Sequence, residues 1–207
     1  MHRKAFLALA IVGCFAAAAA AAVPTMSAGD HLLQAETPGQ TVQILVSSPF
    51  PLDVPPFNSP DGIQGLDLYI VVNNDSGPAP LITAVDIIGP GTIFDGNNTG
   101  QGDFGPPYQA PGLQVVATTT TGSGTVDPNG ILAFVTFDTT GVPFGDYPWS
   151  LTSPLFGPSD FAAAPGSDAI LIDGVLTVVP EPASIVMGLF AAAGLGAVMI
   201  RRRRAKA

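Results

Sequence analysis

Short β-forming runs, separated by turns rich in glycine, proline, asparagine and aspartate, restrict the fold of this chain more than any other feature of its sequence. The clearest run, residues 66–73, has leucine, isoleucine or valine at every second position, which is the period of a strand with one buried face. Turn sequences such as 73–78 and 127–130 separate the runs. Residues 23–179 show no convincing apolar period of about 3.6 residues. We therefore predict an all-β fold.

Six more runs predict further strands of the same kind. They lie at residues 41–47, 81–88, 113–121, 131–138, 147–152 and 169–178. About seven to nine short strands with glycine- and proline-rich turns indicate a single antiparallel β-sandwich. Residues 23–179 are long enough for one such domain, which would bury about two-thirds of the surface of the unfolded chain.

The N-terminus has the three parts of a secretory signal peptide. His2, Arg3 and Lys4 form a basic head, small and apolar residues follow to Ala22, and the alanines at 20–22 provide an A-x-A cleavage site. We expect residues 1–22 to be removed after Ala22, with a site near Ala28 as the alternative. An uncleaved N-terminal anchor is disfavoured because the alanine-rich run is only weakly apolar.

The single cysteine, Cys14, lies inside this predicted signal peptide. Residues 11–14 resemble a lipobox, in which the cysteine would carry a lipid, but the apolar residues that follow differ from the polar tether of a lipoprotein. Without the signal peptide the protein has no cysteine, so its stability must come from a packed core and not from disulfides.

Charge is distributed unevenly along the chain. Of the 16 acidic residues, all but Glu181 lie in residues 23–179, whereas all 7 lysines and arginines lie outside that segment. The segment therefore carries a formal charge of about −15, compared with −9 for the whole chain. A surface of this kind repels phosphate backbones, so nucleic acid is excluded as a partner, and cations are its natural companions.

Residues 180–207 have the composition of a membrane-anchored tail. Pro180, Glu181 and Pro182 precede the apolar residues 183–200, and Arg201, Arg202, Arg203 and Arg204 follow directly. As a helix, residues 183–200 would span about 27 Å, close to the hydrocarbon thickness of about 30 Å. The arginines would each cost about 2.5–3.5 kcal/mol to translocate, so they should stop transfer and keep residues 201–207 cytoplasmic.

The order of these parts resembles the PEP-CTERM sorting tail, with Pro180-Glu181-Pro182 as the sorting motif. An ordinary single-pass anchor would share the helix and the basic stop, but not the motif immediately before the helix. The resemblance implies a Gram-negative-type bacterium, export across its inner membrane, and processing near the motif by an exosortase, an integral-membrane cysteine protease. It also implies transient anchoring, followed by a place at the cell surface or in the extracellular matrix, together with exopolysaccharide.

The body resembles the cohesin-like, carbohydrate-binding-domain-like β-sandwich family. Four segments carry the resemblance in order: PGQTV at 38–42, GLDLYIVV at 65–72, GILAFVTF at 130–137 and GDY at 145–147. Asn73 and Asn74 stand where many relatives have a Tyr-Asp pair. The resemblance implies a jelly-roll sandwich.

Catalysis is disfavoured by what the body lacks. It has no lysine or arginine, and its one histidine, His31, has no G-x-S-x-G segment to supply a nucleophile. With fifteen carboxylates some pair will satisfy any spacing, so acid pairs carry no information. We expect no enzyme and no required cofactor.

Two weaker patterns suggest ligands. Asp95, Asn97 and Asp103 lie in a segment that partly imitates a calcium loop, although Pro106 stands where the last acidic ligand should be, so a solvated turn is favoured. Tyr108, Tyr147 and Trp149 could stack on sugar rings, although core packing is the commoner fate of Tyr147 and Trp149 on one strand face.

The sequence as a whole predicts one of two functions: an exported, non-catalytic surface or matrix protein, or a secreted carbohydrate-binding module with a specific glycan.

Overall fold

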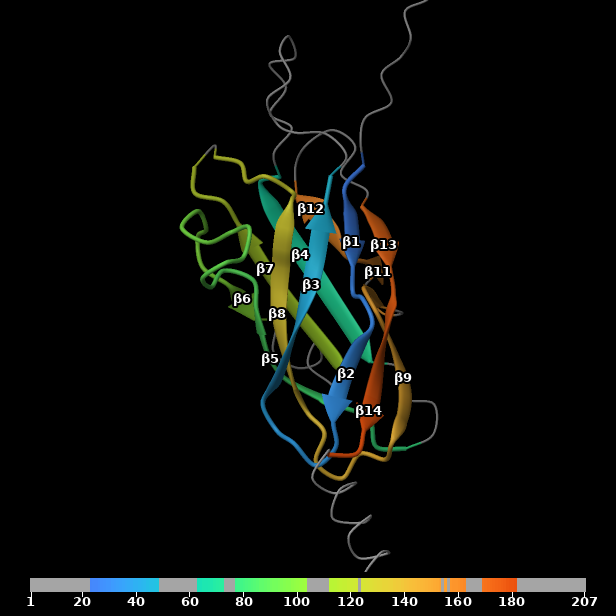
Figure 1. Ribbon diagram of the computed structural model, residues 1–207. Helices are drawn as coiled ribbons and strands as arrows, with labels where there is room; N and C mark the ends of the chain where they lie inside the picture. Colours follow the sequence, from blue (N-terminus) through green and yellow to red (C-terminus); the bar gives the residue numbers. More distant parts are fainter. Residues whose placement is uncertain are drawn as a thin grey trace, which may run out of the picture.

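The period-two runs of the sequence become the strands of two packed sheets in the computed structural model (Figure 1). The structure describes residues 23–48, 63–72, 77–103, 112–122, 124–153, 155, 157–162 and 169–181. These residues form strands, turns and bends and contain no helix, so the all-β prediction is confirmed for them. The predicted signal peptide, the membrane helix at 183–200 and the basic end at 201–207 lie outside the described residues.

One layer is a five-stranded sheet with the order β13-β1-β3-β8-β5. Its strands are β13 (Ile170–Ile172), β1 (Thr25–Ser27), β3 (Gln40–Ser47), β8 (Gly130–Asp138) and β5 (Leu81–Asp86). All neighbours are antiparallel except β1 and β13, which are parallel. A register shift between Ile44 and Leu45 marks an irregularity in the long β3–β8 ladder.

The other layer has the order β2-β14-β9-β4-β7-β6, with β12 paired to β4. Its strands are β2 (His31–Gln34), β14 (Gly174–Val179), β9 (Gly145–Ser150), β4 (Gly65–Val72), β7 (Leu113–Thr119), β6 (Gly102–Asp103) and β12 (Asp160–Ala162). The strands β10 (Thr152–Ser153) and β11 (Gly157–Pro158) form a separate hairpin. Here β2 and β14 are the parallel pair.

The N-terminal and C-terminal segments of the domain each contribute one strand to both layers: β1 and β13 to the five-stranded sheet, and β2 and β14 to the other. This arrangement explains both parallel pairs. The chain leaves β1, turns at Gly29 with a φ of 74°, and enters β2 in the other sheet. It crosses in the same way from β13 to β14 at Asp173. The prediction of a purely antiparallel sandwich is therefore wrong at these strands, because the two ends of the domain run side by side in the same direction.

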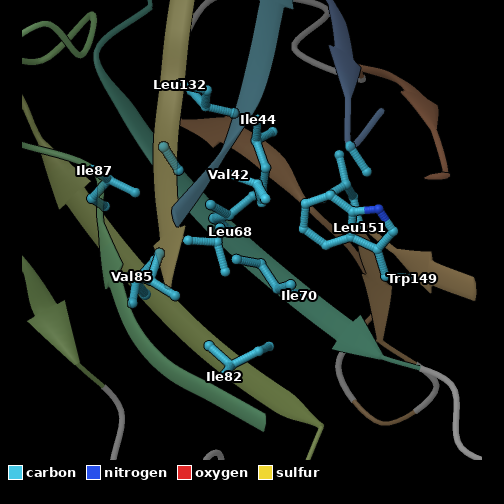
Figure 2. Close-up of a cluster of buried hydrophobic side chains, with 14 of the residues drawn as sticks. Val42, Ile44, Leu68, Ile70, Ile82, Val85, Ile87, Leu132, Trp149 and Leu151 are labelled. Carbon is cyan, nitrogen blue, oxygen red and sulfur yellow. The ribbon is translucent and has the colours of Figure 1, made fainter. Parts of the chain in front are cut away.

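The core lies between the sheets and is built from the inward residues of the alternating strands. Ile44, Leu68, Ile70 and Trp149 have no exposed surface, and Figure 2 shows them gathered between the layers. Burying each isoleucine or leucine side chain of this kind contributes about 1.5–3 kcal/mol relative to leaving it exposed. No buried side-chain nitrogen or oxygen of the described residues lacks a hydrogen-bond partner.

Candidate functional site

Two turns meet at the end of the sandwich where β14 finishes, and side-chain hydrogen bonds join them. Thr139 is fully buried, and its Oγ1 lies 2.6 Å from the carbonyl oxygen of Gln34 and 3.1 Å from the backbone nitrogen of Thr37, from which it accepts. Gln40 Nε2 donates to the carbonyl oxygens of Gln34 and Thr37 at 2.7 and 2.9 Å. We call residues 35–40, 139–145 and 179–181 the exit end.

Glu36 adds a further tie across the exit end. Its Oε2 accepts from the backbone nitrogen of Gly141 at 3.1 Å, which links the turn after β2 to the turn after β8. Glu36 has a φ of 52°, a left-handed conformation that costs a non-glycine residue roughly 1–2 kcal/mol. The surrounding hydrogen bonds hold Glu36 in this conformation, so the turns of the exit end are fixed relative to one another.

The sorting residues Pro180 and Glu181 begin directly after the last strand. The Val179 carbonyl accepts from the Ala35 nitrogen at 2.9 Å, and Thr37 Oγ1 lies 3.4 Å from Glu181 Oε1. Both Pro180 and Glu181 are half-buried. The structure thus places two of the three predicted sorting residues against the body, with no linker after β14. Pro182 and Arg201–Arg204 lie outside the described residues.

An exposed aromatic side chain, Phe144, lies beside the end of β14, where the chain continues into Pro180. Gly145 of β9 pairs with Val178 of β14, so the preceding Phe144 borders the end of the strand. Phe144 is 63% exposed, and the neighbouring turn is fastened by a 2.8 Å hydrogen bond from the Tyr147 hydroxyl to the Pro143 carbonyl. Sequence reasoning missed Phe144, because nothing near it in the sequence marks it as exposed.

The predicted sugar platform is not assembled among the described residues. Trp149 is fully buried, its Nε1 donates to the Gly29 carbonyl at 2.9 Å, and its ring meets those of His31 and Phe137 edge-on at 5.7 Å. Because a buried ring cannot stack on a sugar, Trp149 is not available as part of a sugar-binding platform in this structure. Tyr147 is half-buried with its hydroxyl occupied, and Tyr108 lies outside the described residues.

The oxygens of the candidate calcium loop have separate protein partners. Asp95 Oδ2 accepts from the Gly91 nitrogen at 3.3 Å, and Asn97 Oδ1 accepts from the Thr121 hydroxyl at 2.8 Å. Asp103 Oδ1 accepts from Gln101 Nε2 at 2.9 Å. Within the part of the chain that the structure describes, no group of three or more His, Cys, Asp or Glu residues is placed to hold a metal ion.

Two titratable side chains of the described residues, His31 and Asp138, make local structural contacts. His31 Nε2 lies 3.0 Å from the Ala28 carbonyl oxygen, an arrangement that suits a protonated Nε2 as donor. Hydrogen bonds from the hydroxyl and backbone nitrogen of Thr140 lower the pKa of the half-buried Asp138 below its ordinary value. None of the carboxylates that the structure describes is buried.

A row of apolar side chains crosses the outer face of the five-stranded sheet. Ile172, Leu45 and Ile131 lie in register on β13, β3 and β8, with Ser27 of β1 between the first two. Ile172 and Leu45 are each 49% exposed, and Ile170 beside them is 55% exposed. The sequence did not reveal this row because its members come from separate strands.

Residues 178–204 match the PEP-CTERM protein-sorting motif. This motif indicates an exported protein with a C-terminal, membrane-anchored sorting signal, as the sequence predicted. Among the described residues no helix is both long and apolar enough to cross a membrane. No curated protein matches the chain.

The fold is similar to that of cohesin modules. A type I cohesin–dockerin complex from Clostridium thermocellum matches with a TM-score of 0.54 at 12% identity, covering 76% of this chain and 99% of that chain. The third cohesin of ScaC and the sixth cohesin of scaffoldin B, both from Acetivibrio cellulolyticus and both solved with a dockerin, give TM-scores of 0.53 and 0.51 at 14% and 13% identity, with the same coverage. The predicted cohesin-like sandwich is therefore confirmed as a fold.

Proposed function

We propose that this chain is an exported, non-catalytic protein of the cell surface or extracellular matrix, delivered by its C-terminal sorting tail and associated with exopolysaccharide. The observation that carries the proposal is the placement of the sorting signal: the match begins at Val178 inside the last strand of a cohesin-type sandwich, and Pro180 and Glu181 follow that strand directly. The sandwich is then the cargo, and the tail is a signal that an exosortase removes.

The body's chemistry supports binding and not catalysis. It has no lysine or arginine to stabilise a developing negative charge, and its one histidine is packed against Trp149. Among the described residues, several carboxylates accept from backbone nitrogens at turns, and no three acidic, histidine or cysteine side chains are grouped to hold a metal ion. A braced sandwich with an exposed apolar row suits an adhesion module that holds another protein.

The structural neighbours point to the same class of partner. Their structures were solved as complexes with dockerins, so the fold can present a protein-binding surface. We infer that this sandwich binds a protein at the cell surface, while its charge of about −15 favours a partner surface that is basic or bridged by cations. The exopolysaccharide association follows from the sorting tail and not from a sugar site in the sandwich.

Export and sorting can be tested together in cells. The full-length protein is expressed in two otherwise identical bacterial strains, one with and one without an exosortase, and each is separated into membrane, surface and medium fractions. We expect release from the membrane only with the exosortase. Equal membrane retention in both strains would contradict the proposal and leave an ordinary anchor.

The binding role needs a second measurement. The protein released by the exosortase strain is applied to a glycan array and to surface extract from the same cells. We expect chemical cross-links between the released protein and proteins of the surface extract, and no saturable binding on the glycan array. Saturable binding to one glycan would instead establish the carbohydrate-binding module, and turnover of a glycan would establish an enzyme.

A further inference from the structure

The last strand before the sorting motif is held on both sides. Val178 of β14 pairs with Leu33 of β2 and with Gly145 of β9, and the pairing with β2 continues to Val179. Leu176 and Val178 are buried in the core, with 0% and 2% exposed. Peeling this end of β14 away would break two ladders and uncover apolar surface, so the chain as far as Val179 stays in the fold.

The contacts continue past the strand into the motif. The Val179 carbonyl is occupied by the Ala35 nitrogen at 2.9 Å, Pro180 has no N–H to offer, and the Glu181 carboxylate faces Thr37 at 3.4 Å. The turn that carries Ala35 and Thr37 is itself braced through Thr139. The Thr37 hydroxyl makes its shorter bond to the Ala35 carbonyl at 2.9 Å, so its contact with Glu181 is the weaker one. The backbone is therefore held through Val179, and Glu181 lies beside the same turn.

Enzymes that act on peptides commonly bind them as extended strands, through backbone N–H and C=O groups. In the folded protein those groups are already used around Val178 and Val179. We propose that the folded sandwich blocks processing at every bond up to Pro180–Glu181 and directs it to a bond C-terminal to Glu181. The sandwich thus sets the position of cleavage, and this inference rests on the proposed function.

The chemical step is an ordinary peptide hydrolysis. Water adds across a bond beyond Glu181, so the carbonyl carbon gains the hydroxyl and becomes the new carboxylate of the body. The nitrogen gains the proton and becomes the new amine of the released tail. The mature protein should therefore keep Pro180 and Glu181 and lose the arginines.

A disulfide lock tests whether β14 must open. Gln34 and Val179 are direct neighbours in the parallel β2–β14 pair, so the double variant Gln34→Cys/Val179→Cys can form a disulfide in an oxidising compartment. The single variants Gln34→Cys and Val179→Cys are matched controls, because neither can form the lock. All are expressed in full length with an exosortase, and intact-mass spectrometry reports the disulfide and the C-terminal residue.

We expect the locked protein to be processed within about two-fold of the single variants, because cleavage beyond Glu181 needs no opening of the strand. All products should end at Glu181 or later. A wild-type product that ends at or before Pro180 would overturn the inference without any variant. A ten-fold loss of processing in the locked protein alone would also overturn the inference, provided that its urea unfolding shows that it is folded normally. An intact tail in every protein would overturn the proposed function as well.

Discussion

At the crossing of the two sheets, the α-carbon of Gly174 lies directly against the backbone of Gly29. A methyl group there would overlap the Gly29 carbonyl and come within 2.6 Å of Trp149 Nε1, which bonds to the same carbonyl. Backbone cannot move aside as a flexible side chain can, so we predict that Gly174→Ala lowers the free energy of unfolding by about 3 kcal/mol or more. Urea unfolding of the exported protein measures this.

The matched control is Gly77→Ala. A methyl group at Gly77 would meet no atom within 4 Å, and its backbone is not left-handed. We expect a change within about 0.5 kcal/mol. Equal effects of the two substitutions would contradict the assignment of the crossing as a close-packed point.

A second prediction at the scale of single residues concerns Thr139, the buried hydroxyl of the exit end. Thr139→Val keeps the shape but removes the acceptor of the Thr37 nitrogen and the partner of the Gln34 carbonyl. Leaving such buried groups unpaired costs about 1–3 kcal/mol each, so we expect about 2–3 kcal/mol of lost stability in urea unfolding.

Thr136→Val provides the comparison for Thr139. Thr136 is only half-buried on the outer face, where its hydroxyl meets that of Thr41 at 3.2 Å. Water can replace that bond, and the expected change is within about 0.5 kcal/mol. If Thr139→Val were equally mild, the exit end would not be braced through its hydroxyl.

At the scale of elements, the sequence predicted the long strands because alternation over six or more residues is a strong signal. The runs at 41–47 and 131–138 became β3 and β8 almost unchanged. It missed β1, β2 and β12, whose three or four residues are too short to show a period. The run at 169–178 was predicted as one strand but breaks at Asp173, since crossing between sheets is a tertiary event.

The candidate site was predictable only in part for the same reason. The sorting motif is a local pattern of consecutive residues, so its position could be predicted. The contact of Glu181 with Thr37 joins residues far apart in sequence, and only the β2–β14 pairing brings them together. Trp149 was assigned to a strand correctly, but its neighbours His31 and Phe137 could not be foreseen.

The central place of β14 leads to a prediction about chain ends. A chain that stops after Asp173 lacks Leu176 and Val178, leaves β2 without its neighbouring strand and leaves β9 paired only with the end of β4, so we expect it to be degraded after export. A chain that stops after Glu181 keeps the complete sheet, and we expect it to unfold at the same urea concentration as the exosortase product. Equal protease resistance of the two truncated chains would show that β14 is dispensable.

At the scale of the whole molecule, the body must hold its carboxylates without basic partners. Several of them accept from backbone nitrogens instead: Asp30 from Val175 at 3.0 Å, Asp86 from Gly89 at 2.7 Å, and Asp138 from Thr140 at 2.8 Å. These bonds favour the ionised carboxylate and are local. They do not cancel the repulsion among like charges spread over the surface, which amounts to tenths of a kcal/mol for each exposed pair.

The last prediction separates screening of that repulsion from a bound ion. Raising sodium chloride from about 10 mM to 0.5 M shortens the Debye length from about 30 Å to a few ångströms, so the exosortase product should gain about 1 kcal/mol of stability. Calcium at matched ionic strength should add nothing, because the oxygens of Asp95, Asn97 and Asp103 already have separate partners. Thermal unfolding measures both effects, with Asp95→Asn as the control.

A saturable gain from millimolar calcium that Asp95→Asn abolishes would establish a calcium site there. If neither salt had any effect, the carboxylates would be too dispersed to repel one another measurably.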